Sequence, residues 1–168
     1  PLASICGRVC GFCEEACNRQ NYDQAVRIRA LKRFAADYQI QKRRAKATGQ
    51  AAAKGPTGDK DASAKRVAII GSGPAGLTAA YDLALAGYRP VIFEALNLPG
   101  GMLRYGIPSY RLPDSILDYE INLIKETGVE IKTGRPFGPD LTFKQLLDDD
   151  YKAVFLAIGT QASRSLSI

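Results

Sequence analysis

The 168-residue chain contains no histidine and no tryptophan, and its hydrophobic and charged fractions, 46% and 24%, are ordinary for a globular domain. Without imidazole, serine–histidine triads, cysteine–histidine dyads and histidine-ligated metals are excluded. The sequence also lacks an apolar run near the roughly 18 to 20 residues that span a bilayer, and no charged start precedes an apolar stretch. We therefore expect a cytoplasmic protein without a membrane span.

Basic charge is concentrated in one part of the chain. The net charge is +6, and the first 65 residues carry 13 of the 23 basic side chains but only 6 of the 17 acidic ones. A basic segment can bind nucleic acid, but no nucleic-acid-reading motif accompanies this one. We expect no nucleic-acid partner and favour either a solvated helix face or a docking surface for an acidic partner.

All four cysteines lie within 12 residues, at Cys6, Cys10, Cys13 and Cys17. Disulfides between them would close only very short loops, and no secretory signal is visible. Clustered thiolates instead favour a metal or an iron–sulfur cluster, and the intervening glycines permit tight turns that aim the sulfurs inward. We favour iron–sulfur ligation, with tetrahedral zinc or unligated thiols as the alternatives.

After the cysteines, the sequence indicates one helix and then a linker. Helical spacing predicts a helix from Gln24 to Ile40 with a strongly cationic side, and its apolar positions are Val26, Ala30, Leu31, Phe34, Ala35 and Tyr38. Periodicity is lost over residues 45–64, which are rich in Gly, Ala, Lys, Thr and Asp. We therefore predict a helical cysteine-rich segment over residues 1–44, a linker over 45–64 and a second domain over 65–168.

The second domain opens with the pattern of a βαβ unit. An apolar, β-branched run, Arg66–Ile70, leads into a glycine-rich turn, then a helix that stops at Gly87, then a second apolar run, Val91–Phe93, that ends at Glu94. The turn reads Gly71, Ser72, Gly73, Pro74, Ala75 and Gly76. Together these elements predict a Rossmann-like α/β fold.

Chemistry supports a dinucleotide at this turn. Gly71 permits the tight turn, Gly73 lets the backbone approach a pyrophosphate, and the helix N-terminus supplies N–H donors. Glu94 stands at the separation expected of a carboxylate that accepts bonds from ribose hydroxyls. A βαβ unit without a ligand is the alternative, whereas a Walker phosphate loop is excluded because no Gly-Lys-Ser/Thr follows the glycines.

The remaining segments complete the predicted fold. Glycine and proline predict turns at 98–101 and 105–108. Beyond them the pattern predicts a helix over Ser115–Thr127, a strand over Val129–Ile131, a helix over Leu141–Asp148 and a final buried strand over Tyr151–Ile158.

These residues resemble a known family. The stretches CGRVCGFCEEACNR, GSGPAGLTAA, PGGMLRYGIPSYRLP and FLAIGTQASR are similar to the small (beta) subunit of NAD(P)H-dependent glutamate synthase and its relatives, which include the amino-terminal part of dihydropyrimidine dehydrogenase. The resemblance implies a Rossmann-like FAD-binding domain preceded by a small helical segment that contributes ligands to [4Fe-4S] clusters. It also implies that NAD(P)H binds through a further domain, so we expect this chain to be part of a longer polypeptide.

The resemblance also assigns residues. The turn from Gly71 to Gly76 would bind the FAD pyrophosphate, and Glu94, with Ala95 beside it, would hold the ribose. Further cofactor-binding positions would be Gly101, Met102, Gly106, Gly159 and Thr160. The implied cluster ligands are Cys10, Cys13 and Cys17, with Cys6 preceding them.

Two functional hypotheses follow. The favoured one is an electron-transfer module that passes electrons from NAD(P)H-reduced FAD through iron–sulfur clusters to a larger catalytic or electron-accepting subunit. The other is a non-catalytic scaffold or regulatory subunit that retains the nucleotide-binding fold. A disulfide reductase that uses Cys10 and Cys13 is disfavoured, because that pair precedes the flavin domain and lies among four clustered cysteines.

Overall fold

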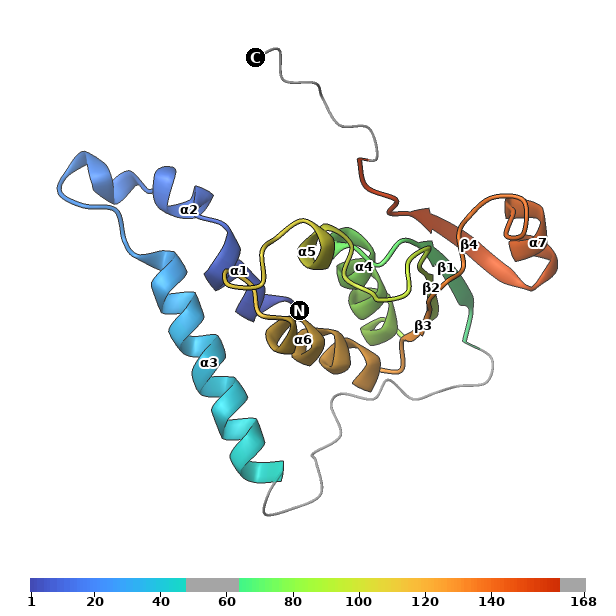
Figure 1. Ribbon diagram of the computed structural model, residues 1–168, viewed down its shortest axis with the longest axis horizontal. Helices are drawn as coiled ribbons and strands as arrows, with labels where there is room; N and C mark the ends of the chain where they lie inside the picture. The colour runs from blue at the N-terminus through green and yellow to red at the C-terminus, as the bar shows by residue number, and fades with distance from the viewer. Residues whose placement is uncertain (48–63, 161–168) are drawn as a thin grey trace, which may run out of the picture.

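A four-stranded parallel sheet forms the centre of the fold (Figure 1). The computed structural model describes residues 1–47 and 64–160. The strands lie in the order β3-β2-β1-β4, so the two strands of the predicted βαβ unit pair with each other. Their bounds are β1 Arg66–Ile70, β2 Arg89–Phe93, β3 Glu130–Lys132 and β4 Tyr151–Leu156. The predicted Rossmann-like α/β fold is confirmed.

The two faces of the sheet carry separate apolar clusters, because successive side chains of a strand point to opposite faces. Val67 and Ile69 pack with the helices α4, Pro74–Leu85, and α6, Asp114–Glu126, in the larger cluster. Ala68 and Ile70 face a smaller cluster that includes Leu146 of α7, Phe143–Asp148. Each of these helices contributes apolar side chains to one face of the sheet.

The last strand differs from its prediction in its burial as well as in its end. The last strand is present, but it ends at Leu156, and most of its residues are exposed rather than buried. Tyr151 is buried beside Phe93, whereas Phe155 and Leu156 are 43% and 52% exposed. An apolar run predicts a strand from its own side chains, but its burial depends on what covers it, and β4 lies at the edge of the sheet.

The cysteine-bearing region consists of short helices followed by one long helix. These elements are α1 Ala3–Val9, α2 Phe12–Glu15, a 3₁₀ helix Asn18–Asn21 and α3 Ile28–Ala47. The helix that was predicted from Gln24 therefore begins four residues later and continues seven residues further. The extension into the predicted linker consists of residues with high helix propensity but no apolar period, which explains why it was missed. The rest of that linker, 48–63, lies outside the described residues.

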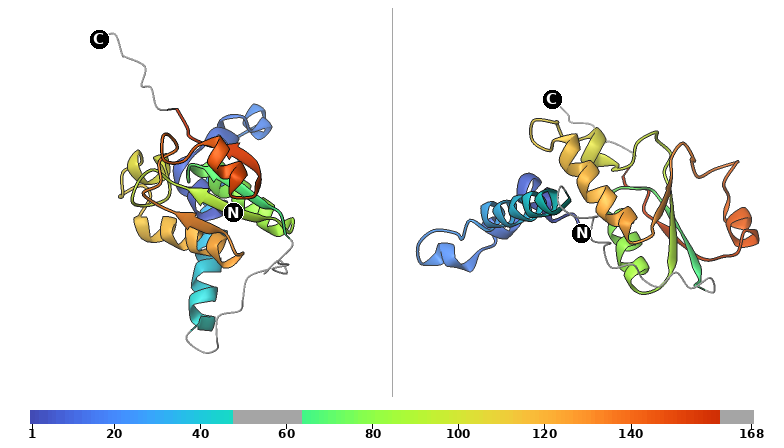
Figure 2. Two further views of the ribbon diagram at one scale, coloured as in Figure 1. Left: turned by 90° about the vertical axis from the view of Figure 1, so that its right-hand side faces the viewer. Right: turned by 90° about the horizontal axis from the view of Figure 1, so that it is seen from below.

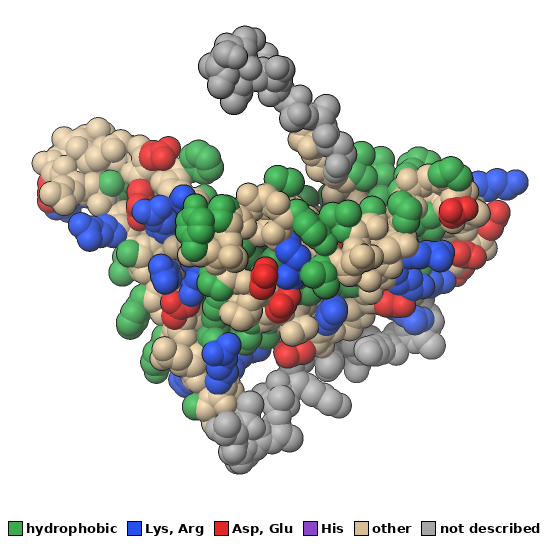
Figure 3. Space-filling model, viewed as in Figure 1, with side chains coloured by type: hydrophobic (Ala, Val, Ile, Leu, Met, Phe, Trp, Pro, Cys, Tyr) green, Lys and Arg blue, Asp and Glu red, His purple; other side chains and the backbone are tan. Residues whose placement is uncertain are grey.

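Helix α3 packs on α1 through a different side from the one that the apolar pattern suggested. Its buried side chains are Ala36 and Ile40, and a Cβ at Gly7 of α1 would stand only 2.6 Å from the backbone nitrogen of Arg33. The predicted stripe of Leu31, Phe34 and Tyr38 is instead exposed. In Figure 3, hydrophobic and basic side chains alternate along this helix. Apolar spacing predicted the helix correctly, but not which side is buried.

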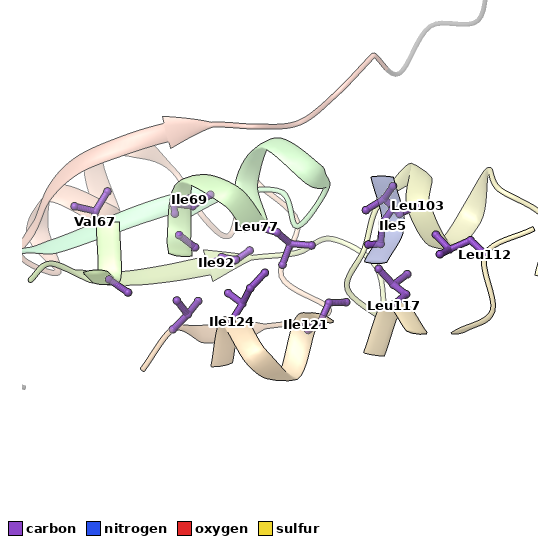
Figure 4. Close-up of a cluster of buried hydrophobic side chains, with 13 residues drawn as sticks. Ile5, Val67, Ile69, Leu77, Ile92, Leu103, Leu112, Leu117, Ile121 and Ile124 are labelled. Atoms are coloured by element: carbon purple, nitrogen blue, oxygen red, sulfur yellow. The ribbon is translucent and has the colours of Figure 1, made fainter. Parts of the chain in front are cut away.

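The cysteine region and the nucleotide domain meet at α1 and α6. In Figure 2 the cysteine region projects away from the sheet while α1 lies against the domain body, and Arg43 of α3 also pairs with Glu126 of α6. Figure 4 shows Ile5 of α1 beside Leu103 and Leu117, as part of the larger apolar cluster. Within the described ranges, we find no helix that combines the length and the apolar character needed to cross a membrane.

Candidate functional site

The turn after β1 is shaped by glycines that tolerate no side chain. Gly71 has φ +103°, and its N–H donates to the carbonyl of Phe93 at 2.8 Å. A Cβ at Gly71 would lie 2.4 Å from the carbonyl oxygen of Ala157, and a Cβ at Gly76 would lie 2.0 Å from that of Gly71. These two glycines are therefore required by backbone conformation and by close packing of helix on strand.

Gly73 is different from the other two glycines. Its φ of −67° suits any residue, and apart from its two neighbours in the chain no described residue has an atom within 4 Å of the position that a Cβ would occupy. Gly73 caps the start of α4, where Pro74 follows and the first-turn N–H groups have no carbonyl partner within the helix. Neither conformation nor packing within the described chain explains a glycine here. A ligand that approaches the backbone does explain it.

Glu94 is buried at the end of β2 and bonded to the turn. Its Oε2 accepts the N–H of Ser72 at 2.9 Å and also the Ser72 hydroxyl, and its Oε1 accepts the N–H of Leu96 at 2.9 Å. Three of the roughly four lone-pair positions of the carboxylate are thereby used. The remaining position on Oε1 can accept one further donor, such as one ribose hydroxyl.

Ser72 links the turn to the loop that follows β2. While its hydroxyl donates to Glu94, its oxygen accepts the N–H of Gly100 at 3.0 Å, and the Ser72 side chain is fully buried. Gly101 then approaches so closely that its Cβ would stand 2.9 Å from Cα of Gly73. The loop containing Gly100 and Gly101 is thus held directly against the turn.

The other predicted cofactor residues are spread more widely. Ala95 is exposed beside Glu94. Met102 begins the short helix α5, Met102–Tyr105, which was not predicted between the two turns; Met102 is 68% exposed and Gly106 ends that helix. Gly159 and Thr160 are exposed and follow Ala157, which lies against Gly71. The structure therefore brings the turn, Glu94 and Gly101 together, while the remaining positions lie in exposed segments that follow them in the chain or follow β4.

Two residues at the site escaped the sequence analysis. One is Gly100, whose φ of +129° and contact with Ser72 could have been anticipated from the paired glycines. The other is Arg104, whose side chain is 8% exposed, donates to the carbonyl of Pro99 at 2.7 Å and pairs with Asp118 of α6. Arg104 thereby fastens the loop to α6. A single arginine in a turn gives no sequence signal for such a role.

Two of the four cysteines are close to each other. The sulfur of Cys6 on α1 lies 3.6 Å from that of Cys10, which directly follows this helix, and Nζ of Lys32 on α3 lies 3.5 Å from Cys6 Sγ. The pKa of the Cys10 thiol is raised, mainly by the hydrogen bond with Cys6 and to a smaller extent by burial. A bound cation has the opposite effect, because it favours the thiolate.

Cys13 lies on α2, and Cys17 precedes the 3₁₀ helix. Hydrogen bonds from backbone N–H groups to the Cys17 sulfur lower the pKa of this thiol. The N–H of Val26 has the largest effect and that of Arg19 the next largest. Such N–H groups stabilise a thiolate and tune the iron–sulfur clusters that thiolates ligate. Residues around Val26 therefore fold over Cys17 before α3 begins.

The four sulfurs do not converge on one point. Over residues 1–47 and 64–160, no three His, Cys, Asp or Glu side chains are arranged so that they could share a metal ion. Four thiolates around one tetrahedral zinc, the alternative left open by the sequence, would need such an arrangement. If the thiolates instead belong to separate centres, the four sulfurs of this segment need not converge on one point.

A parallel sheet with a glycine turn at a helix N-terminus and a buried carboxylate at the end of β2 defines a Rossmann-like nucleotide-binding domain. Comparison with known proteins agrees. Residues 69–132 match the family described as NAD(P)-binding Rossmann-like domain, and residues 1–44 match the family described as dihydropyrimidine dehydrogenase domain II, 4Fe-4S cluster. The chain therefore joins an iron–sulfur-type segment to a nucleotide-binding domain.

Relatives match almost the whole chain. It is 48% identical to the NADP(+)-dependent formate dehydrogenase subunit beta of Moorella thermoacetica over 99% of its length, which is 25% of that protein. It is 42% identical over 100% of its length to 24% of the NADPH-Fe(3+) oxidoreductase subunit beta of Geobacter sulfurreducens. A third relative is the NAD-dependent dihydropyrimidine dehydrogenase subunit PreT of Escherichia coli, at 38% identity over 99% of this chain and 39% of that protein. The chain is thus a homologue of these NAD(P)H-dependent oxidoreductase subunits, which confirms the predicted relation to dihydropyrimidine dehydrogenase.

The chain spans between a quarter and two fifths of the length of these relatives. Among solved structures, Mycobacterium tuberculosis FprA in complex with NADPH has a similar fold, with a TM-score of 0.54 and 26% identity. That similarity covers 62% of this chain and 25% of FprA. The fold and the similarity to part of these oxidoreductase subunits are therefore established for this chain.

Proposed function

We propose that this chain is the FAD-binding electron-transfer part of an NAD(P)H-dependent oxidoreductase. The observation that carries the proposal is Gly73, where a glycine stands although neither the backbone conformation nor any described neighbour requires it. A pyrophosphate in contact with this backbone accounts for the residue. The names of the relatives, which include NAD-, NADP(+)- and NADPH-linked enzymes, support the link to nicotinamide chemistry.

Glu94 favours FAD over NADP(H) at this turn. A carboxylate that accepts a ribose hydroxyl repels a 2′-phosphate, so the site should take a dinucleotide with an unmodified adenosine ribose. Two of the relatives are named for NADP(+) or NADPH, which carries that phosphate. In such enzymes the nicotinamide nucleotide needs another site, and we assign that site to a domain outside this chain.

The chain's own residues would bind and orient the cofactor. Backbone at Gly73 and the first-turn N–H groups of α4 would contact the pyrophosphate, and Oε1 of Glu94 would accept one ribose hydroxyl. When bound, FAD supplies the conversion of a hydride from NAD(P)H into two single electrons, which clusters accept one at a time, and a proton that is released to solvent. No side chain of this chain is needed as an acid or a base.

The cysteines would provide the exit for electrons. Cys10, Cys13 and Cys17, preceded by Cys6, would act as [4Fe-4S] ligands divided between clusters, and N–H groups at Cys17 favour the thiolate that ligation requires. The relatives are named as subunits, which supports transfer onward to a larger catalytic or electron-accepting partner. An activity like that of the glutamate synthase small subunit stays a prediction.

The first experiment tests the nucleotide. Full-length protein that contains these residues should bind FAD, show a flavin absorbance spectrum and lose that spectrum on anaerobic addition of NADH or NADPH. Gly73→Val should lower FAD affinity by at least about tenfold, because a branched side chain would occupy the space next to the pyrophosphate. Equal FAD retention by Gly73→Val and wild type would contradict the assignment. Colourless protein with unchanged partner binding would favour the scaffold function.

The second experiment tests the cysteines. In anaerobically purified full-length protein, we expect Cys10→Ser, Cys13→Ser and Cys17→Ser each to remove about four irons, the content of one [4Fe-4S] cluster, while FAD content is unchanged. Iron and sulfide analysis with electron paramagnetic resonance measures this. Stoichiometric zinc without iron would replace the electron-transfer role of the segment by a structural one.

A further inference from the structure

We infer that Glu120 is a positioning residue that docks the cysteine-bearing helix α1 on the nucleotide-binding domain. Glu120 lies on α6 and is 4% exposed. One carboxylate oxygen accepts the N–H of Leu2 at 2.9 Å, and the other accepts the N–H of Ser4 at 2.7 Å. Both donors belong to the start of α1, where N–H groups have no partner within the helix.

The position of Glu120 on α6 shows that the nucleotide domain is built to receive α1. Glu120 stands among Leu117, Ile121 and Ile124, the buried residues of this helix, where an apolar residue would be expected. A buried carboxylate is costly unless it is hydrogen-bonded. The bonds found for it come from the start of α1, so without α1 the carboxylate would exchange these two bonds for water beside the domain's apolar core.

Two further contacts fix the rest of α1. Ile5 packs into the larger apolar cluster of the domain, and Nη2 of Arg111 donates to the carbonyl of Val9 at 3.3 Å. Glu120 and Arg111 thus hold the two ends of a helix that carries Cys6, while Cys10 follows directly after it. Glu120 and Arg111 thereby help to determine where these sulfurs lie relative to the nucleotide turn. They do so through hydrogen bonds to the backbone of α1 and Leu2, and not to the sulfurs or to the turn.

The consequence for electron transfer rests on the proposed function, whereas the docking role does not. If Cys6 and Cys10 belong to the cluster region, a rigid α1 keeps the distance between that region and the cofactor constant. Loss of the Glu120 bonds would let α1 fray and would change that distance. We therefore expect Glu120 to affect transfer between the cofactor and the clusters, and to leave cofactor reduction by NAD(P)H unaffected.

The experiment compares Glu120→Gln with Leu146→Ala in the full-length protein. Gln keeps the size of Glu120 but turns an NH₂ group toward one of the two N–H donors. Leu146 on α7 is buried in the smaller apolar cluster, on the face of the sheet opposite α6, so Leu146→Ala controls for general loss of stability. Hydrogen exchange resolved by segment measures docking, and stopped-flow absorbance separates flavin reduction from cluster reduction.

For Glu120→Gln we expect amide exchange in α1 to become at least about tenfold faster, with β1 and β2 unchanged. Cluster reduction should slow by about tenfold, while the rate of flavin reduction and the FAD content match those of wild type. Arg111 is exposed, so Arg111→Ala should be well tolerated by the fold. This variant should make amide exchange in α1 about threefold faster.

Unchanged exchange in α1, or uniformly faster exchange in all segments as in a merely destabilised protein, would overturn the inference. Unchanged cluster reduction despite faster exchange in α1 would overturn its role in electron transfer. Protein without FAD and iron would contradict the proposed function, and exchange in α1 would still decide whether Glu120 docks this helix.

Discussion

The nucleotide-binding domain and the cysteine region differ in how their positions are maintained. Among the residues that the structure describes, the cysteine region contributes three buried hydrophobic side chains, Ile5, Ala36 and Ile40, and the others lie in residues 66–160. The domain can hold its glycine turn by its own core. A segment with so little buried surface depends on ligands or on a neighbouring surface for a unique conformation.

The same difference is visible in the glycines of each region. In the domain, Gly71 lets the turn approach the segment that follows β4, Gly76 lets α4 approach the turn and β1, and Gly73 faces open space. In the cysteine region, Gly7 allows α1 to approach the backbone of α3. Apart from its neighbours in the chain, a Cβ placed at Gly11 would have one neighbour within 4 Å among the described residues, Nη1 of Arg29 at 3.9 Å, which is ordinary contact distance. Matched substitutions can therefore separate packing from binding in both regions.

The largest effect is expected at Gly76. Gly76→Val should lower the free energy of unfolding by about 3 kcal/mol or more, because its side chain would collide with the carbonyl of Gly71. Gly73→Val should change it by no more than about 1 kcal/mol, the cost of a poorer N-cap. Urea denaturation without nucleotide measures both. Equal losses would remove the distinction between a packing glycine and a binding glycine.

A smaller loss is expected at Glu94. Glu94→Ala should lower the free energy of unfolding by about 2 to 3 kcal/mol, because the N–H groups of Ser72 and Leu96 lose their acceptor. FAD affinity should fall as well, by about tenfold or more, through loss of the ribose contact. Denaturation and fluorescence titration measure the two effects. A loss of affinity without a loss of stability would assign Glu94 to the ligand alone.

In the cysteine region, Gly7→Ala should lower the free energy of unfolding by about 1 to 2 kcal/mol. Its Cβ would meet the Arg33 backbone and would push α1 away from α3. Gly11→Ala, with room around it, is the matched control and should stay within about 0.5 kcal/mol of wild type. Hydrogen exchange in α1 and α3 reports the change. If both variants behave alike, the close contact at Gly7 is not what holds these helices together.

The smallest effect is expected where the two regions meet through exposed charges. Arg43 on α3 and Glu126 on α6 are 3.8 Å apart, and both are about half exposed. Glu126→Gln should change stability by less than about 0.5 kcal/mol and should lose even this effect at high salt. Thermal unfolding at two salt concentrations measures it. A larger loss than that of Gly7→Ala would mean that charge, rather than packing, joins the regions.

The sequence predicted the central βαβ unit well because each signal acts locally. The run Arg66–Ile70, the glycines after it and the apolar spacing of α4 each determine the backbone within a few residues. The exposed side of α3 and the exposed strand β4 were not predictable in this way. Their burial depends on which elements pack against them, and apolar spacing along one segment does not contain that information.

What the sequence alone determined is therefore the glycine-rich turn between a strand and a helix and the clustering of four thiols, because both depend on residues that are neighbours in the chain. Only the tertiary structure decided that Gly73 is unconstrained while Gly76 is packed, and that Glu94 is bonded to Ser72 and Leu96. It also decided that Glu120 meets Ser4, 116 residues away. Such contacts arise when separate elements pack together and bury a polar group that then needs a partner, wherever in the chain that partner lies.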